Sequence, residues 1–408
     1  MKAGSKKDFD LIIAGGGMVG SALGCLVAAQ SPDTRVCVLE PRPPENPGDD
    51  KGWALRVSAI SRASQAVLEH AGAWSGIAAG RISPYRRMMV WEGDDPGRGL
   101  SFGAEDVGEA ELGHIIENSL VQWALARRLE QLPNVLVIPA AVEAVGVEPG
   151  QVTVIAGSHG TIAGRLLVGA DGAGSPTRSM MDISTRGWSY HQRAIVTTIR
   201  TERAHRDTAF QRFLPGGPIA FLPLCDRSIS IVWSTPEQDT DALLALDDDA
   251  FMEAVSEASG QVLGKVITIG NRAAFPLRAQ YATRYTDKRF ALIGDAAHAV
   301  HPLAGQGVNL GYLDVAVMAE VFLESLAQGR DPGDLRCLRK YERWRKGENL
   351  AMLAAIDGLG RAYKVGSGPL PYLRKIGVDL LGRTPMAREL FVRRAMGLAG
   401  DLPRWAVA

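Results

Sequence analysis

The chain has 408 residues, of which 46% are hydrophobic and 22% are charged, values typical of a globular protein. This length allows roughly two or three domains, each with a substantial core. The 45 Lys and Arg side chains balance the 45 Asp and Glu side chains, so the overall charge argues against a nucleic-acid partner. The four cysteines are isolated from one another, which argues against a disulfide framework or a zinc site.

The polar first ten residues and the short apolar run after them lack the pattern of a signal peptide. No window reaches about 18 uninterrupted apolar residues, so a membrane-spanning helix is not expected. We therefore expect a cytoplasmic protein, with peripheral contact to the inner face of the membrane as an alternative that the C-terminal tail raises.

The first 40 residues predict a strand, a tight turn, a helix and a second strand. Residues 8–14 are apolar and β-branched, residues 18–30 have helical spacing, and residues 35–40 form the next strand. A βαβ unit of this kind implies a parallel sheet. The Pro- and Gly-rich residues 41–51 predict a loop.

Later segments repeat the helix and buried-strand patterns, at residues 118–131, 135–138, 166–168, 289–293 and 307–326. Short alternating runs, typical of an antiparallel sheet, occupy residues 194–200, 219–224 and 229–233. The predicted fold is α/β: a Rossmann-like nucleotide-binding domain with an inserted antiparallel β-sheet domain and a helical C-terminal tail. We place the first domain at residues 1–80, 105–185 and 275–330, the insert at 81–104 and 186–274, and the helical region at 331–408.

The segment from Gly15 to Gly20, with Met18 and Val19 inside it, fits the pattern GxGxxG. The first glycine permits a sharp turn, Gly17 lets the backbone approach a pyrophosphate, and the third lets helix and strand pack closely. Glu40 follows where a carboxylate can accept hydrogen bonds from a ribose. The glycine pattern alone is weak, but the strand, helix and acid around it predict a dinucleotide site.

Three later segments refine this prediction: residues 54–61 with Arg56, residues 169–178 with an Asp-Gly pair, and residues 289–314 with Gly294-Asp295 and a Gly-rich stretch. Together they resemble the single-component FAD aromatic monooxygenases, the class that includes 4-hydroxybenzoate hydroxylase. The run from His301 to Gly311, followed by Asp314, is similar to the signature of the ring hydroxylases of ubiquinone biosynthesis. So are residues 113–118 and 394–398.

The resemblance implies that FAD is the cofactor and that the following residues hold it: Gly15, Gly17, Met18, Val19, Gly20, Glu40, Arg56, Asn118, Val142, Asp171, Gly294, Asp295, Pro302, Gly305, Gln306, Gly307, Val308 and Asn309. Asp295 would hold the ribityl chain, and the amides of residues 307–309 would face the flavin pyrimidine. Helix capping is the alternative role for Asp171 and Asp295.

By the same resemblance, NADPH or NADH reduces the flavin, and O2 then gives a flavin C4a-hydroperoxide that hydroxylates a polyprenylated phenol. Candidate residues for the substrate cavity are Phe213, Phe221, Pro223 and Pro302, and ordinary sheet core is the alternative for each. No residue stands out as a base that activates the phenol. His298 and His301 lie three apart, but without further ligands they predict no metal site.

Residues 361–404 contain nine Lys or Arg against three acids, a net charge of +6, with apolar residues at near-helical spacing. Such a tail predicts contact with a membrane surface or with another ubiquinone-biosynthesis protein; a helix pair packed on the first domain is the alternative. Three other functions stay open: a soluble small-phenol hydroxylase, a flavoprotein such as a prenyl reductase, and an FAD-bearing assembly subunit with little activity of its own.

Overall fold

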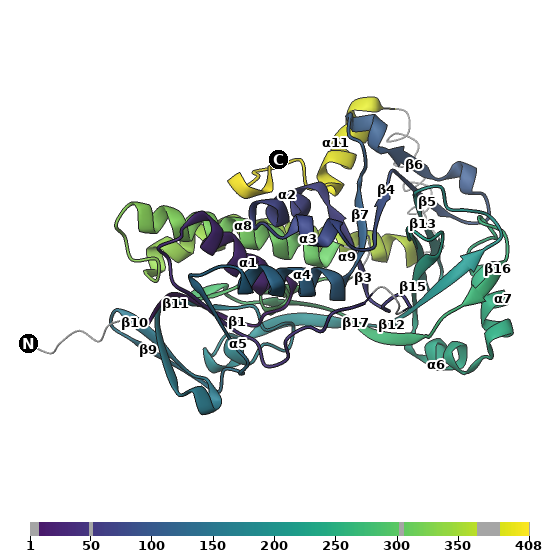
Figure 1. Cartoon of the computed structure of the whole chain (residues 1–408). Helices are drawn as coiled ribbons and strands as arrows, with labels where there is room; N and C mark the ends of the chain where they lie inside the picture. The colour runs from purple at the N-terminus through teal and green to yellow at the C-terminus, as the bar shows by residue number, and fades with distance from the viewer. Residues whose placement is uncertain (1–7, 49–51, 302–305, 365–383, 408) are drawn as a thin grey trace, which may run out of the picture.

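The first domain is built on a parallel sheet, and the predicted βαβ unit lies at the centre of that sheet. The computed structural model describes residues 8–48, 52–301, 306–364 and 384–407 (Figure 1). Strand β1 (Phe9–Ala14) lies between β11 (Thr161–Gly169) and β2 (Val36–Leu39), and all three run parallel. The outer parallel strands are β8 (Val135–Ile138) beside β2 and β19 (Phe290–Leu292) beside β11. Antiparallel β9 (Ala144–Glu148), β10 (Gln151–Ile155) and β18 (Thr286–Asp287) complete the sheet.

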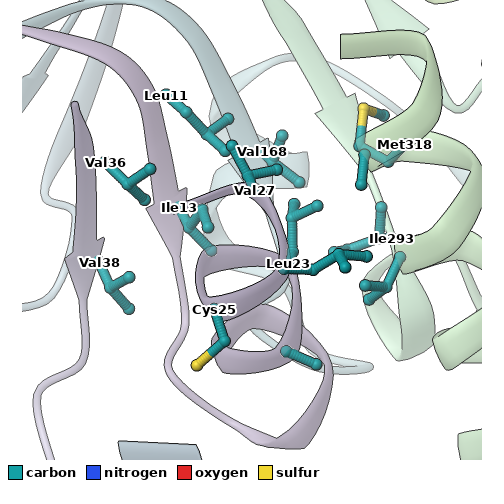
Figure 2. Close-up of a cluster of buried hydrophobic side chains, with 14 of the residues drawn as sticks. Leu11, Ile13, Leu23, Cys25, Val27, Val36, Val38, Val168, Ile293 and Met318 are labelled. Atoms are coloured by element: carbon teal, nitrogen blue, oxygen red, sulfur yellow. The ribbon is translucent and has the colours of Figure 1, made fainter. Parts of the chain in front are cut away.

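Helices cover this sheet because its central strands are apolar on both faces. Helix α1 (Met18–Gln30) packs beside α4 (Asn118–Glu130) and α8 (Gln306–Ala327). Figure 2 shows Leu23 and Val27 of α1 among side chains from the sheet and from α8, including Met318. The strands and helices predicted for the first domain form at the positions that the residue pattern indicates.

Two glycines allow α1 to begin directly above the end of β1. Gly15 has φ +100°, a conformation that L side chains rarely adopt, and a Cβ at this position would lie 2.5 Å from the Ala170 carbonyl oxygen. A Cβ on Gly20 would lie 1.9 Å from the Gly15 carbonyl oxygen. The first and third glycines of the motif are therefore required by the packing of the protein itself.

The insert is a long, mainly antiparallel sheet, as expected. Its strands lie in the order β20 (His298–Ala299), β17 (Ala273–Ala282), β12 (Thr185–Thr201), β15 (Ile229–Pro236), β14 (Gly217–Pro223), β13 (Thr208–Leu214), β5 (Arg87–Glu92) and β6 (Leu100–Gly103). Strand β16 (Val266–Ile269) pairs with β12. Helices α6 (Glu237–Ala245) and α7 (Asp248–Ala258) lie beside this sheet, and the side chains of α7 join its core (Figure 1).

Strand pairing moves two of the domain boundaries taken from the sequence. Strand β17 pairs with β12, so the insert continues to residue 282 rather than ending at 274. Strand β4 (Ile82–Tyr85) pairs with β7 (Gly113–Glu117), which also pairs with β3 (Val57–Ser61). This small sheet places residues 82–85 with the first domain, whereas the sequence pattern predicts them in the insert. Short helices α2 (Arg62–His70), α3 (Trp74–Ala78) and α5 (Pro176–Met180) complete the first domain.

The C-terminal region contains α9 (Leu335–Lys364), which packs along α8, and α11 (Pro385–Ala395). In α11, Val392 is buried, whereas Met386 is 82% and Leu390 is 62% exposed. The apolar part of the predicted tail, residues 370–381, lies outside the described residues, so its contact with a membrane or a partner stays a prediction. None of the helices within the described ranges is long and apolar enough to cross a membrane.

Substituting Gly20→Ala tests the packing beneath the glycine loop. The new methyl group would overlap a backbone carbonyl that cannot rotate away, so we expect a loss of about 3 kcal/mol or more in the free energy of unfolding, at the upper end of overpacking effects. Urea denaturation followed by circular dichroism measures this loss. Gly347→Ala is the control, because its Cβ would meet no atom within 4 Å and alanine favours a helix. Equal stability of both variants would contradict the close packing.

Candidate flavin and substrate site

Gly17, the second glycine of the GxGxxG motif, has open surroundings. A Cβ on Gly17 would meet no described atom within 4 Å, and Gly17 occupies the N-cap position of α1 with no side-chain cap. The amides of the first turn of α1 therefore face space, with the positive end of the helix dipole behind them. This is the arrangement that binds a phosphate.

Glu40 lies beside this loop, directly after β2. Its Oε2 accepts a hydrogen bond from the Gly16 amide at 2.7 Å, and its Oε1 accepts one from the Arg42 amide at 2.9 Å. The carboxylate is half-buried rather than enclosed. It is thus held next to the phosphate-binding turn, where the spacing in the sequence placed it.

Two later glycines bring the second half of the site against the same turn. A Cβ on Gly294 would lie 3.1 Å from a methyl group of Val19, and one on Gly311 would lie 2.8 Å from the other. Gly294 belongs to the short turn η4 (Gly294–Ala296) after β19, and Gly311 belongs to α8. The start of α1, the turn after β19 and the start of α8 therefore meet around Val19, although about 290 residues of chain separate the first from the last.

The carboxylate of Asp314, in the middle of α8, fixes this meeting point. It is fully buried and accepts hydrogen bonds from the Gly294 amide (3.0 Å), Arg345 Nε (2.8 Å) and Asn349 Nδ2 (3.1 Å). Its Oδ2 also lies 2.5 Å from His298 Nε2. Burial by itself raises the pKa of Asp314, but His298 and Arg345 outweigh burial and lower the pKa to about 2.

Asn309 connects the first turn of α8 to the small sheet through its side chain. Its Nδ2 donates to the Ala59 carbonyl (2.9 Å), and its Oδ1 accepts from the Ser61 amide (3.0 Å) and the Ser64 hydroxyl (2.7 Å). The side chain is therefore fully used inside the protein. What the first turn of α8 can offer a ligand is its backbone amides, as the resemblance implies.

The other predicted FAD residues differ in how freely they can reach a ligand. Asp295 reaches the protein surface, but the atoms around its carboxyl shield it from water and raise its pKa, and no hydrogen bond to it comes from the described part of the chain. Asp171 instead accepts hydrogen bonds from the Thr177 amide (2.9 Å) and hydroxyl (2.8 Å), the local role that was its alternative. Asn118 Oδ1 accepts from the Ser58 hydroxyl at 2.7 Å, and the Arg56 guanidinium lies 5.8 Å from the centre of the Phe275 ring.

At four other positions predicted to hold FAD, the structure gives little or no evidence of a contact with the cofactor. Val142 is buried and lies between β8 and β9 rather than within a strand. Pro302 and Gly305 lie outside the described residues, so their predicted roles stay predictions. A Cβ on Gly307 would come no closer than 3.7 Å to Val300, which leaves room beside the first turn of α8.

A cavity of about 180 Å³ lies between the insert sheet and the C-terminal half of α9, beside His301. Its lining comes from β12, β13, β14 and α9, and the main side chains are Trp188, Tyr190, Phe213, Leu214, Ile356 and Asp357. The ring centre of Tyr190 lies 4.9 Å from that of His301. His301 immediately precedes the segment that leads to α8, so the cavity adjoins the proposed flavin position.

Of the aromatic and proline residues predicted for the substrate, the described structure places Phe213 in the wall of this cavity. Phe221 packs instead in the core of the insert, on the face that meets Phe251 of α7. Pro223 is two residues from Phe221 in the same strand and therefore shares its face. Both are core residues, because alternation along a strand does not reveal which face meets the cavity. The sequence reasoning missed Tyr190 and Asp357.

The arrangement fits FAD: the N-terminus of α1 has open space in front of Gly17, Glu40 lies beside it, and Asp295 and the start of α8 lie close to the same turn. The fold and site thus define an FAD-dependent aromatic monooxygenase. Comparison with known proteins agrees, since residues 8–352 match the family model described as an FAD binding domain.

The chain is 37% identical to the ubiquinone hydroxylase UbiL of Rhodospirillum rubrum over 389 residues, 95% of this chain and 89% of that protein. It is 32% identical to the 3-demethoxyubiquinol 3-hydroxylase of Escherichia coli, covering 95% and 98% of the two chains. The p-nitrophenol 4-monooxygenase PnpA of Pseudomonas putida shares the fold, with a TM-score of 0.77 at 17% identity over 97% of this chain and all of that one. The chain belongs to the ubiquinone-biosynthesis hydroxylase family of FAD monooxygenases. FAD is its cofactor, and the family uses NAD(P)H and O2.

Substituting Gly17→Val should remove FAD and leave the fold intact. The valine side chain would fill the space in front of α1 without meeting protein atoms, so it would exclude the pyrophosphate alone. The affinity for FAD is expected to fall at least about tenfold, which is about 1.4 kcal/mol of binding free energy, and the purified protein should carry less flavin, as its visible absorbance shows. Gly347→Val, also in open space but on α9, should retain its flavin. A yellow Gly17→Val protein with full flavin content would refute this role.

Substituting Asp314→Asn should cost about 3–5 kcal/mol of stability, because it leaves Arg345 buried without its counter-charge. The pKa of Asp314 is lowered in the folded protein, from 3.8 to about 2. Its charge therefore adds stability above pH 4, and this contribution, about 2 kcal/mol, is lost as the pH falls from about 4 to 2. Urea denaturation at several pH values should show the difference between wild type and variant shrinking over that window. A difference that does not depend on pH would contradict the assignment.

Proposed function

We propose that this enzyme hydroxylates the aromatic ring of a polyprenylated phenol in ubiquinone biosynthesis. The observation that carries this proposal is the aromatic-lined cavity beside the flavin loops. Support for the pathway comes from the relatives, which include a ubiquinone hydroxylase and a demethoxyubiquinol hydroxylase at more than 30% identity over nearly the full chain.

The cavity has the size and lining that suit one substituted ring. Apolar cavities of about 150 Å³ hold a benzene molecule, and this one is about 180 Å³. Phe213, Leu214 and Ile356 form apolar walls, and Phe213 and Ile356 pack against each other. A polyprenyl chain is much larger than this volume, so the ring would occupy the cavity and the chain would extend out of it.

Different residues around this cavity would bind the cofactor, position it and exclude water from the reacting ring. When bound, FAD takes reducing equivalents from NAD(P)H and activates O2. Gly17 and the first turn of α1 would hold the pyrophosphate, Asp295 the ribityl chain, and the amides at the start of α8 the pyrimidine edge. Those amides would stabilise negative charge on the ring system, since they are fixed donors at the positive end of a helix. The apolar walls exclude water from the reacting ring.

A deletion strain of the native host tests the pathway. Loss of one ring hydroxylation is expected to leave a prenylated precursor that lacks one oxygen, which quinone profiling by mass spectrometry identifies. A normal quinone profile with loss of growth on a small phenol would instead indicate a soluble small-phenol hydroxylase. An altered profile that a flavin-free Gly17→Val variant restores would indicate an assembly subunit.

Substituting Leu214→Trp tests the cavity without touching the flavin. The larger ring would fill part of the 180 Å³ that the substrate requires. We expect binding of an alkylphenol, followed by the change in flavin absorbance, to weaken at least about tenfold, because the new ring and the ligand compete for one volume. The flavin content should stay unchanged. Unaltered phenol binding would place the substrate elsewhere.

A further inference from the structure

One end of the cavity is polar, and its groups are incompletely paired. Asp357 of α9 is 14% exposed, and its Oδ2 binds Arg361 Nε at 2.7 Å. Its other oxygen, Oδ1, is buried and accepts no hydrogen bond of good geometry from any group in the described ranges. A buried carboxylate oxygen without a donor is costly, so the cavity offers an unfilled acceptor position.

The same end already holds a phenol, the side chain of Tyr190. Burial, and after it the negative charge of Asp357, raises the pKa of Tyr190 to about 12. The hydroxyl therefore stays protonated at neutral pH and lies close enough to Asp357 to interact with its carboxylate, although its geometry toward Oδ1 falls short of a well-formed hydrogen bond. Trp188, whose buried Nε1 lies near the Tyr190 hydroxyl but makes no well-formed hydrogen bond within the described residues, borders the same space. A phenolic hydroxyl is thus sterically and chemically compatible with this end of the cavity.

We propose that Asp357 recognises the substrate by accepting the hydrogen bond of its phenolic hydroxyl through Oδ1. A ring that lies against the apolar wall of Phe213 and Ile356, with its hydroxyl toward Asp357, would supply the donor that Oδ1 lacks. A hydrogen bond to an ionised carboxylate also shifts electron density from the O–H bond into the ring, which favours attack on an electrophilic oxygen. The residue would therefore determine specificity for phenols over their ethers.

The ion pair with Arg361 fixes the orientation of the Asp357 carboxylate. The Arg361 side chain is 71% exposed, so the ion pair with Asp357 reaches the solvent on one side and the cavity on the other. Because Oδ2 is taken by this ion pair, the carboxylate cannot rotate freely, and Oδ1 stays directed away from Arg361. The exposed pair adds little stability of its own, so a change at Arg361 should leave the fold intact.

The test compares binding of 2-alkylphenols with binding of their O-methyl ethers to the oxidised holoenzyme, without turnover. The two ligands have nearly the same shape, but only the phenol can donate a hydrogen bond. Titration followed by flavin absorbance should give the wild type a preference for the phenol of about tenfold or more, the range for a hydrogen bond to a charged group. Asp357→Asn should reduce that preference at least threefold.

Two variants serve as comparisons. Glu348→Gln, a carboxylate on the same helix that pairs with Arg394 at the surface, should keep the wild-type preference. Tyr190→Phe removes the hydroxyl that lies beside Asp357, and it should keep or raise the preference for the phenol. This variant distinguishes Asp357 from Tyr190 as the hydrogen-bond partner even if Asp357→Asn does not fold. A fall to no preference in Tyr190→Phe would make Tyr190 the partner and overturn the proposal.

The inference rests on the proposed function, and the outcomes separate the two. A wild type that binds phenols and ethers equally well would overturn the role of Asp357 and leave the proposed function standing. A wild type that binds neither ligand would overturn both. An unchanged preference in folded, flavin-loaded Asp357→Asn would overturn the role of Asp357 alone.

Discussion

The site depends on one buried charge, the carboxylate of Asp314. It joins the turn after β19, the middle of α8 and the middle of α9, three segments that no local interaction brings together. Removing a carboxylate from water is expensive, and only the hydrogen bonds from Gly294, Arg345 and Asn349 with the contact to His298 offset that cost. The charge is therefore satisfied in this arrangement of the three segments, which places Gly294 and Gly311 against Val19 at the start of α1.

Helix α9 connects the buried charge near the flavin loops with the wall of the proposed substrate cavity. Arg345 contacts Asp314 near the flavin loops, and Asp357 lies twelve residues later in the same helix, about 18 Å along its axis. A single rigid element thus connects the part that positions the flavin with the wall of the cavity (Figure 1). The insert sheet supplies the opposite wall through Tyr190 and Phe213, so the cavity exists only when both domains are in place.

The sequence predicted the parts of the fold that depend on local patterns. The βαβ unit and its glycines were identified because a tight turn and a close approach each restrict the residue type to glycine. The predicted domain boundaries near residues 82–85 and 274–282 differ from those in the structure, since hydrogen bonding between strands distant in the sequence decides which sheet a strand joins. Phe221 was assigned to the cavity because alternation marks two faces without saying which one is covered by α7.

Two acidic side chains have roles that the sequence alone does not reveal, for one physical reason. Asp314 belongs to the signature that the sequence resembles, but its partners on α9 could not be inferred before the helices were placed together. Asp357 had none, because an acid four residues before an arginine in a helix is an ordinary surface pair. Its unpaired oxygen becomes visible only once the insert sheet closes over it.

The most direct measurement is a titration of the flavin-free protein with FAD, FMN and riboflavin, followed by quenching of flavin fluorescence. If the turns at the start of α1 and at the start of α8 hold opposite ends of one molecule, FAD should bind with a stoichiometry of one per chain and far more tightly than FMN or riboflavin, which lack the adenosine half. Equal affinity for FAD and riboflavin, or a protein that stays colourless with FAD, would contradict that arrangement.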